Sequence, residues 1–333
     1  MSQGVLELGT YTTAIDTFLA RLFPTDAHPL YMMARESVVK GGRRIRATLA
    51  LLGCEALSGD YRPALPMAAA YELAHSAALI QDDILDKAAL RRGLQTTWSE
   101  HGIDRAILTM DIVLFTIPSI IAQYVRTRLP RNRLDQLLEM LGKSSRDAAL
   151  GEYMDLQLAE RATVPLNDYL EMARLKTGSL LAAPAACGAI IGGGTAKQVR
   201  ALYEFGEALG TAYQIVDDII DLTGSQEKTG KPSLNDLKNG KFNTVIAIAF
   251  EALERGGRTS DTNFIKSLRG REIPQEERSK LKRILVESGT LGKADKLAAT
   301  ITSNAQEALE KVVGSDAARK LLELSAYVSR RAE

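Results

Sequence analysis

The stretch MAAAYELAHSAALIQDDILD, residues 67–86, combines the two features that decide the fold of this chain. Its apolar residues recur at spacings of three and four, which is the period of a helix buried along one face. It ends in three carboxylates, Asp82, Asp83 and Asp86, set among isoleucine and leucine. Because unpaired carboxylates are costly on a partly buried helix, the pattern predicts a helix that holds something positive.

A second segment, QIVDDIID at residues 214–221, repeats the pattern with Asp217, Asp218 and Asp221. In each segment the first and last carboxylates are four residues apart, so they project from the same face of a helix. Gly224 indicates that the second helix ends close to Asp221, where the negative end of the helix dipole disfavours a carboxylate. Mg²⁺ suits both segments, because it takes oxygen ligands and is commonly held by one or two carboxylates plus substrate phosphates.

The helical period extends over most of the chain, including residues 134–158 and 201–222, and alternating strand patterns are hard to find. Breakers separate the helices at Pro24 with Pro29, residues 59–66, Pro130, Pro165, residues 192–194, residues 224–232, residues 256–257 and Pro274. No long low-complexity linker separates two halves. The sequence therefore predicts an all-α fold, with residues 1–333 forming one large helical bundle around a central cavity.

The composition excludes several classes of function. Lys and Arg total 42 against 41 for Asp and Glu, so no overall basic field favours nucleic acid or an anionic membrane. Cys54 and Cys187 lie among small apolar residues, which predicts buried free thiols in a reducing cytoplasm rather than disulfides or a zinc site. The first ten residues lack the pattern of a signal peptide. The apolar stretch at residues 112–121 is interrupted by Pro118 and is too short to span a bilayer.

Basic residues cluster near both acidic segments, and Lys and Arg are the side chains that neutralise phosphates. The clusters are Lys40-Gly41-Gly42-Arg43-Arg44-Ile45-Arg46, Arg91-Arg92-Gly93, Lys176-Thr177-Gly178 and a loop with Lys228, Lys231, Lys238 and Lys241. Singly, each cluster is typical of a solvated surface. Their association with two acidic segments favours a diphosphate bridged by Mg²⁺.

Together these elements resemble the trans-isoprenyl diphosphate synthases, also called polyprenyl synthases. The matching elements, in order, are Gly-Gly-Arg-Arg-Ile-Arg at 41–46, His75 seven residues before Asp82, the two Asp-Asp-x-x-Asp runs, Arg-Arg-Gly at 91–93, Lys-Thr at 176–177, Tyr-Gln at 213–214, and Gly-Lys at 230–231 and 240–241. The resemblance implies the isoprenoid synthase fold and a homodimer. It also implies a prenyltransferase that joins isopentenyl diphosphate to an allylic diphosphate (dimethylallyl, geranyl, farnesyl or geranylgeranyl), giving an all-trans product and pyrophosphate.

The resemblance further implies a role for each matching residue. The carboxylates that hold Mg²⁺, about three ions per active site, are Asp82, Asp83, Asp86, Asp217, Asp218 and Asp221. The residues implied for the allylic diphosphate are Arg91, Lys176 and Lys231 as cationic partners, Thr177 and Gln214 beside the ionising carbon, and Lys241 in a lid at residues 224–243. The residues implied for isopentenyl diphosphate are Arg43, Arg46, His75 and Arg92. Four positions depart from the family's usual residue: Arg43 (Lys), Gln95 (Pro), Met110 (Gly) and Glu152 (Gln).

In this family the hydrocarbon tail grows along a tunnel beside the first aspartate helix. Ala78 and Ala77 stand four and five residues before Asp82, and Ala74 is about one turn deeper, so no aromatic residue closes the tunnel at this level. The next bulky residue is Tyr71, about 9 Å from Ala77 at helical rise, or roughly two isoprene units. This predicts a geranylgeranyl or geranylfarnesyl product. The other interpretation is that the alanines only permit close helix packing.

Three other functions remain open at the level of sequence. A terpene cyclase also ionises allylic diphosphates with Mg²⁺, but it needs no second diphosphate site, whereas residues 41–46 with His75 favour condensation. A non-catalytic subunit of a heteromeric synthase is expected to lose acidic motifs, and both are intact here. A helical binding scaffold leaves two acidic segments in apolar surroundings unexplained.

Overall fold

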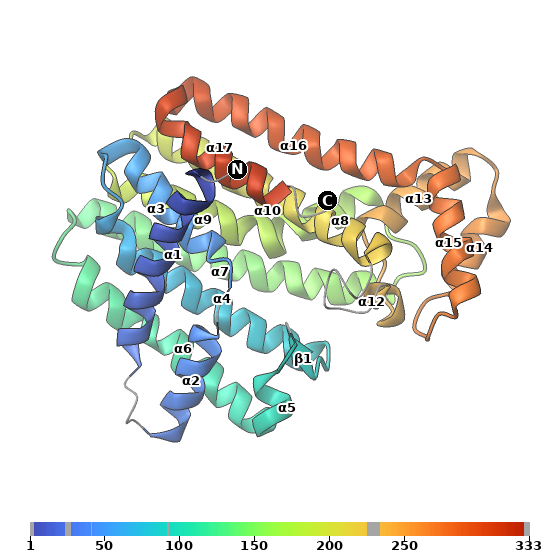
Figure 1. The fold of residues 1–333 in the computed structure, drawn as a ribbon, viewed down its shortest axis with the longest axis horizontal. Coiled ribbons are helices and arrows are strands. Elements are labelled where there is room, and N and C mark those ends of the chain that lie inside the picture. The colour runs from blue at the N-terminus through green and yellow to red at the C-terminus, as the bar shows by residue number, and fades with distance from the viewer. Residues whose placement is uncertain (1–2, 24–27, 41, 92, 225–233, 330–333) are drawn as a thin grey trace. The chain divides into compact units, whose positions relative to one another are not determined.

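The computed structural model describes residues 3–23, 28–40, 42–91, 93–224 and 234–329 (Figure 1). Almost all regular structure in these residues is helical, which confirms the predicted all-α fold. The contacts divide the chain into two compact units. Unit 1 comprises Met1–Ser145, Leu180–Gly206 and Gln306–Leu324, and unit 2 comprises Arg146–Ser179, Glu207–Ala305 and Ser325–Glu333. The single bundle over residues 1–333 stays a prediction.

The elements of unit 1 come mostly from the first part of the chain. They are α1 (Gln3–Leu22), α2 (Pro29–Val39), α3 (Ile45–Ser58), the 3₁₀ turn η1 (Arg62–Ala64), α4 (Leu65–Leu85), β1 (Leu90–Arg91), β2 (Leu94–Gln95), α5 (Thr97–His101), α6 (Ile103–Ile120) and the π-helical turn η2 (Ile121–Val125). Elements with residues in both units are α7 (Arg131–Glu160), α9 (Ser179–Ile191), α10 (Ala196–Thr223), α16 (Thr290–Val313) and α17 (Ser315–Ser329).

Unit 2 adds shorter helices. They are α8 (Leu166–Ala173), the π-helical turn η3 (Arg174–Gly178), α12 (Asn235–Lys238), α13 (Thr244–Arg255), α14 (Thr259–Ser267) and α15 (Gln275–Glu287). Its core is a cluster of buried residues from α7, α8, α10, α12, α13, α14, α15 and α16. Within it Phe242 and Phe250 pack edge to face with ring centroids 5.1 Å apart.

Proline and glycine set many of the helix ends, as the sequence predicts. Pro29 is the first residue of α2, where its missing N–H costs nothing, and Pro66 lies in the first turn of α4. Gly59, with a φ of 77°, ends α3 in the left-handed conformation. Pro118 does not end α6, and the helix passes instead into the π-helical turn η2.

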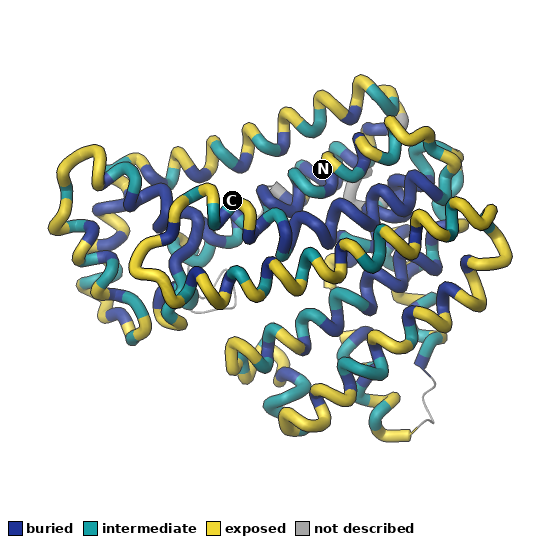
Figure 2. Tube along the Cα trace, turned by 180° about the vertical axis from the view of Figure 1, so that it is seen from behind, coloured by how far each residue is buried: buried dark blue, intermediate teal, exposed yellow. Residues whose placement is uncertain are grey.

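The core of unit 1 surrounds α4, which packs against α1, α2, α3 and α6 (Figure 1). Its Ala68, Ala69, Ala70 and Leu73 are fully buried. Nearby, α3 and α9 approach backbone to backbone: a Cβ on Gly188 would lie 2.1 Å from the carbonyl oxygen of Ala50. Many of the described helices show one buried and one exposed stripe (Figure 2), as their apolar period predicts.

The two cysteines are buried free thiols, which confirms that prediction. The Sγ of Cys54 donates a hydrogen bond to the carbonyl oxygen of Asp60, 3.2 Å away. Cys187 lies 3.3 Å from the hydroxyl of Tyr71. Burial raises the pKa of the Cys187 thiol to about 12, so it stays protonated at neutral pH.

One described helix, Ile103–Val125, is long and apolar enough to cross a membrane by length and composition alone, and 33% of its most apolar window is buried. This helix is longer than the apolar stretch at residues 112–121 that the sequence predicts, because η2 continues α6. A single helix of this kind is weak evidence for a membrane span. Its apolar surface includes Phe115, which is 73% exposed.

Candidate active site

The first acidic segment lies at the carboxyl end of α4, as predicted. α4 ends at Leu85, and the amide of Asp86 donates to the carbonyl oxygen of Asp82 over 2.8 Å. Asp83 is only 6% exposed, whereas Asp82 is half-buried and Asp86 is exposed. The chain then turns at Lys87, which has a φ of 52°, a left-handed conformation that is rare for a residue with a Cβ.

A short hairpin that the sequence analysis did not predict follows this turn. Its strands are two residues each, with Leu90 paired to Gln95, and are too short to show an alternating pattern. The indole of Trp98 and the hydroxyl of Thr96 both donate to the carbonyl oxygen of Ala88, at 2.9 and 2.8 Å, and anchor the base of the hairpin.

Arg91 lies in the first strand of this hairpin. Its Nε is 2.7 Å from Oδ1 of Asp83, and the Asp83 side chain is 8% exposed. A residue predicted to contact diphosphate therefore forms an ion pair with one predicted to hold metal. The pair keeps both charges compensated when no ligand is present.

The residues predicted to bind isopentenyl diphosphate also belong to unit 1. Arg43 is exposed and precedes α3, while Arg46 lies in the first turn of α3 and is half-buried. His75 lies on α4, seven residues before Asp82, and is half-buried. Arg92, the fourth predicted member, lies outside the described residues.

In unit 2, two predicted lysines share one carboxylate. The Nζ atoms of Lys176 and Lys241 lie 2.9 and 3.0 Å from Oδ2 of Asp155, and Lys176 is also 2.6 Å from Oε2 of Glu152. Burial acts to raise the pKa of Asp155, but the charges of the two lysines outweigh it and hold that pKa below its usual value. The structure thus brings together two ammonium groups that the sequence places far apart.

A close approach of helices positions Lys176. It belongs to η3, a π-helical turn, a feature that is frequent at functional sites. Gly151 on α7 lies directly against this turn, and a Cβ there would be 2.2 Å from the amide nitrogen of Lys176. On the other side, a Cβ on Gly210 of α10 would be 2.7 Å from the Cα of Gly178. Glycine at these positions lets three backbones meet.

The next residue of η3 starts a chain of hydrogen bonds. The hydroxyl of Thr177 donates to Oε1 of Gln214 over 3.0 Å, and Nε2 of Gln214 donates to Oδ1 of Asp218 over 3.2 Å. Thr177 and Gln214, which the sequence predicts to share one site, are therefore in direct contact. The amide of Gln214 is held from both ends.

Asp218 is only 2% exposed, so its carboxylate is enclosed by protein rather than open to solvent. Its Oδ2 accepts from the amide and the hydroxyl of Thr244, at 2.9 and 2.6 Å, and its Oδ1 accepts from the hydroxyl of Tyr169 at 3.2 Å. Burial, followed by the charge of Asp236, raises the pKa of Asp218 well above its usual range, although the bonds from Thr244 and Gln214 act to lower it.

The remaining carboxylates of the second segment lie at the end of α10, which runs to Thr223. Asp217 is half-buried. The carboxylate of Asp221 accepts from the amides of Asn235 and Asp236, at 3.0 and 3.3 Å. The positive end of α12 thus offsets the cost of a carboxylate near the carboxyl end of α10.

The described part of the predicted lid begins at this contact. Leu234, with a φ of 64°, donates its amide to the carbonyl oxygen of Asp221 over 2.8 Å. Residues 225–233, including Lys231, lie outside the described residues. Closure of the segment over a substrate stays a prediction.

The described side chains fit Mg²⁺ by donor chemistry. The acidic segments offer oxygen ligands only, and within the described ranges no three His, Cys, Asp or Glu side chains form a closed group around one ion. Mg²⁺ matches such a set, because it is usually held by one or two carboxylates while substrate phosphates and water complete its octahedron. That the two acidic segments face each other stays a prediction.

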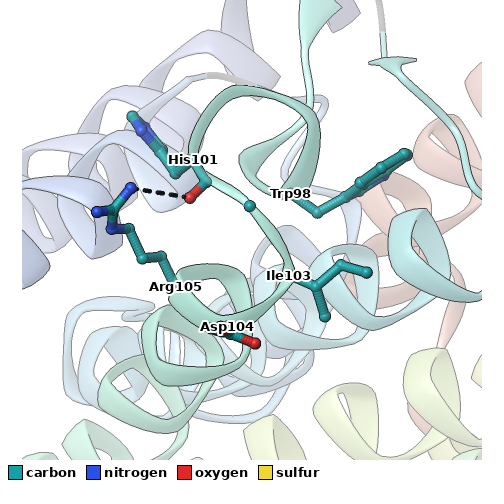
Figure 3. A pocket seen from close by; sticks show the side chains of 6 residues that line it. Trp98, His101, Ile103, Asp104 and Arg105 are labelled. Atoms are coloured by element: carbon teal, nitrogen blue, oxygen red, sulfur yellow. Dashed lines mark hydrogen bonds between the residues drawn. The ribbon is translucent and has the colours of Figure 1, made fainter.

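Among the described residues a surface pocket lies elsewhere, at the turn between α5 and α6 in unit 1 (Figure 3). It is lined by Trp98, His101, Gly102, Ile103, Asp104 and Arg105. The guanidinium of Arg105 donates to the carbonyl oxygen of His101 over 3.2 Å. None of the residues predicted from the sequence to bind substrate or metal lines this pocket.

Sequence reasoning missed several residues that support the site. Asp155, Tyr169 and Thr244 were not assigned roles, and neither were Arg44 and Glu72, described below. Of these, Glu72 is a charged side chain within an otherwise apolar run, which was the available signal. The hydrogen-bond or ion-pair partners of these residues lie far away in the sequence, so the sequence alone did not show which residues pair.

Comparison with known proteins identifies the family of this chain. The polyprenyl synthetase family pattern matches residues 28–285. A geranylgeranyl diphosphate synthase of Methanosarcina mazei is 31% identical, over 98% of this chain and 97% of its own. A geranylfarnesyl diphosphate synthase of Aeropyrum pernix is 34% identical, over 85% and 87%. The crystal structure of a geranylgeranyl pyrophosphate synthetase from Pyrococcus horikoshii superimposes with a TM-score of 0.88 at 30% identity, covering 98% of this chain and 97% of that one.

The family pattern covers most of the chain, including both acidic segments and the basic residues around them, and the two curated relatives cover 98% and 85% of the chain. Both relatives build prenyl chains, and the similarity to the solved structure extends to the all-α fold. The chain therefore belongs to the polyprenyl synthetase family and is a prenyltransferase that elongates isoprenoid diphosphates.

Proposed function

We propose that this enzyme joins isopentenyl diphosphate to an allylic diphosphate with Mg²⁺ and releases pyrophosphate and a geranylgeranyl or geranylfarnesyl product. The contact that carries the proposal is the pair of lysines on Asp155. The ammonium groups of Lys176 and Lys241 lie within 3.0 Å of one buried carboxylate. The residue after Lys176, Thr177, begins the series of hydrogen bonds through Gln214 to Asp218. This arrangement suits a leaving diphosphate, whose negative charge grows as the carbon–oxygen bond breaks.

Lys176, Lys241 and Arg91 stabilise the departing group by charge and by hydrogen bonds. Asp155 and Asp83 hold these cations in place before substrate arrives, so little reorganisation is needed during the reaction. When bound to the aspartates, Mg²⁺ supplies Lewis acidity that further neutralises the diphosphate. The carboxylates proposed to hold it are Asp82, Asp83, Asp86, Asp217, Asp218 and Asp221. The oxygens of Asp218 accept four hydrogen bonds within unit 2, one of them from the amide of Gln214. Asp218 therefore contributes its charge to the metal site and also orients Gln214.

Gln214 and Thr177 lie beside the ionising carbon in this proposal. The hydrogen bond from Thr177 leaves the Gln214 amide oxygen directed at a hydroxyl rather than at solvent. The cation formed on ionisation needs such a shielded polar environment, because free water would convert it to an alcohol.

Arg43, Arg46 and His75 bind the diphosphate of isopentenyl diphosphate. Guanidinium groups match diphosphate oxygens with paired hydrogen bonds, and Arg43 is exposed at the surface. The double bond of the bound substrate then attacks the allylic cation at close range, and the released pyrophosphate removes the final proton.

The product length follows from the buried surface of α4. Ala77 is 2% exposed, Ala74 and Ala78 are half-buried, and Tyr71 is 1% exposed with its hydroxyl 3.3 Å from Cys187. In this proposal the buried ring of Tyr71, held at its hydroxyl by Cys187, forms the floor of the tunnel, and the small residues above it leave room for a chain longer than farnesyl.

We further propose a cytoplasmic homodimer. The side chains on the surface of α6 include Ile103, Ile107, Leu108, Leu114 and Phe115, which are 37–73% exposed. Several large apolar side chains exposed on one helix are unfavourable in water and are typical of a face covered by a second chain.

The test is a condensation assay with the purified chain alone. It combines Mg²⁺, labelled isopentenyl diphosphate and one allylic primer at a time, and the products are sized. We expect incorporation of label and products of twenty or twenty-five carbons, with at least about a 100-fold loss in Asp82→Asn. Glu310→Gln, an exposed acid on α16, is the control and keeps wild-type activity. Consumption of primer without isopentenyl diphosphate would indicate a cyclase, and no activity would indicate a subunit that needs a partner.

A further inference from the structure

Arg44 is held in an unfavourable backbone conformation at the start of α3. Its φ of 49° and ψ of 33° are left-handed, a conformation that is sterically unfavourable for a residue with a Cβ. The described residues with a side chain and a positive φ are Arg44, Lys87 and Leu234, and each adjoins a segment predicted to bind substrate or metal. Such strain persists only where the surroundings compensate it.

The side chain of Arg44 supplies that compensation. It is 5% exposed, and its guanidinium contacts three helices. Nε lies 2.8 Å from Oδ1 of Asp16 on α1, Nη1 lies 3.3 Å from Oε2 of Glu72 on α4, and Nη2 donates to the carbonyl oxygen of Val38 on α2 over 2.8 Å. A lysine ammonium cannot form this planar set of contacts.

Glu72 links the same contacts to α3. The first turn of a helix leaves its amides unsatisfied, and the left-handed Arg44 makes no side-chain cap. Oε1 of Glu72 accepts from the amide of Ala47 over 3.1 Å and takes the place of that cap. The carboxylate is 3% exposed, so each of its oxygens has a protein donor and neither faces solvent.

These contacts connect the two parts of the isopentenyl diphosphate site. Arg43 precedes Arg44, and Arg46 follows it by two residues in the first turn of α3. His75 follows Glu72 by three residues on α4, so both lie on the same side of that helix about one turn apart. The pair of Arg44 and Glu72 thus determines where Arg43 and Arg46 stand relative to His75.

We propose that Arg44 and Glu72 are positioning residues that hold Arg43, Arg46 and His75 in the arrangement that binds the diphosphate of isopentenyl diphosphate. The proposal rests on the proposed function of that site. Arg44 itself does not touch substrate, because its guanidinium is buried and directed at protein acceptors. Its effect is on geometry, and a displacement of about 1 Å in a positioned group costs as much as 100-fold in rate.

The experiment compares Arg44→Lys and Glu72→Gln with wild type, measuring KM for both substrates, kcat and the melting temperature. We expect KM for isopentenyl diphosphate to rise at least 10-fold in Arg44→Lys, while KM for the allylic substrate changes less than 2-fold. Glu72→Gln keeps an oxygen for the Ala47 amide and therefore folds even where Arg44→Lys does not; its KM for isopentenyl diphosphate rises at least 3-fold.

The matched control is Arg35→Lys. Arg35 is a partly buried arginine of α2 whose Nη1 donates to the carbonyl oxygens of Ala20 and Phe23, and it has no contact with α3 or α4 among its hydrogen bonds in the described residues. We expect this variant to lower the melting temperature and leave both KM values unchanged. Equal rises in both KM values for Arg44→Lys or Glu72→Gln, or a change below 2-fold for isopentenyl diphosphate, would overturn the positioning role.

Arg43→Gln separates this proposal from the proposed function. If Arg43→Gln raises KM for isopentenyl diphosphate and the Arg44 and Glu72 variants do not, the site stands and the positioning role fails. If Arg43→Gln has no effect either, the assignment of the isopentenyl diphosphate site is wrong.

Discussion

Glu152 occupies a position that adds a second negative charge beside Lys176. Its Oε2 lies 2.6 Å from the ammonium, and its side chain is 12% exposed. A diphosphate that binds Lys176 must therefore compete with two carboxylates, Glu152 and Asp155. With a neutral glutamine at position 152, the residue that the resemblance to the family leads us to expect, a diphosphate would compete with Asp155 alone for Lys176.

We expect Glu152→Gln to lower KM for the allylic diphosphate by about 3- to 10-fold, because one repulsive charge near the leaving group is removed. The measurement is steady-state kinetics at low salt, where charge effects are least screened. The control is Glu160→Gln, which removes an exposed charge at the end of the same helix. An unchanged or higher KM would mean that Lys176 does not bind this diphosphate.

A second residue, Ala77, tests the product length. Ala77 is buried on α4, and a phenylalanine there fits only if open space lies beside it. With a tunnel present, we expect Ala77→Phe to shift the main product to farnesyl diphosphate with little loss of melting temperature. The products are sized by chromatography, with Ala77→Ser as the small control. Unchanged product length, or unfolding of the variant, would show that the alanines serve helix packing.

Contacts between elements explain how Lys176 is presented. Gly151 of α7 lies against η3, and Gly210 of α10 lies against Gly178, so three backbones converge around one turn. A π-helical turn places its side chains differently from an α-helical turn, and the close packing stabilises that irregularity.

We expect Gly151→Ala to destabilise the fold by about 1–3 kcal/mol, because its Cβ would overlap the backbone of Lys176. It also displaces the ammonium, so kcat/KM for the allylic substrate falls by about 100-fold. Chemical denaturation and kinetics measure the two effects. Gly292→Ala is the control: it lies in α16 with nothing within 4 Å of the added Cβ and stabilises the helix by up to about 1 kcal/mol. Full activity in Gly151→Ala would contradict the role of this contact.

For the whole molecule, the exposed face of α6 determines the expected assembly. We predict a dimer in solution for the wild type and a monomer for Phe115→Asp, because a charge in an apolar interface loses its hydration. Light scattering after size exclusion measures the molar mass. Val286→Asp is the control, since Val286 is 59% exposed on α15, a helix of unit 2. A wild-type monomer, or a dimer that persists in Phe115→Asp, would exclude this interface.

Helices from both ends of the chain meet within unit 1. Tyr11 of α1 donates a hydrogen bond to Glu55 of α3, and Lys320 of α17 donates to Tyr11 and Glu55, over 3.0 and 2.9 Å. Burial and then Glu55 raise the pKa of Tyr11 to about 12. Burial opposes the charge of Lys320, but its hydrogen bonds to Tyr11 and Glu55 raise its pKa above the usual value.

Both groups have folded pKa values above their unfolded values, so their stabilisation is complete below about pH 10 and is lost only as the pH rises through the raised values, which for Tyr11 is about 12. We expect Lys320→Gln to be less stable than wild type by about 1 kcal/mol at pH 8. The difference should begin to shrink above about pH 10.5, where the unfolded lysine loses its proton, and should continue to fall as the pH rises through the raised pKa of Lys320. Denaturation at each pH measures it. Lys311→Gln, at an exposed pair with Glu307, should show no difference at any pH. A difference for Lys320→Gln that is constant with pH would contradict the coupling.

Local chemistry determined much of this protein from its sequence. Pro29, Gly59 and Pro274 mark helix boundaries within a residue of those observed, because missing donors and glycine's conformational freedom act locally. The acidic segments on α4 and α10 were likewise predictable, since a helical period places them on partly buried helices whatever the rest of the fold does.

Only the tertiary structure decided which charges meet. Asp155 receives lysines from positions 176 and 241, Asp218 is enclosed by Tyr169 and Thr244, and Arg44 rather than Arg43 turns inward to Glu72. Each of these outcomes depends on packing between segments far apart in the chain, where burial makes an unpaired charge costly and so selects the pairs. The spacing of residues in the sequence therefore does not predict which charges pair.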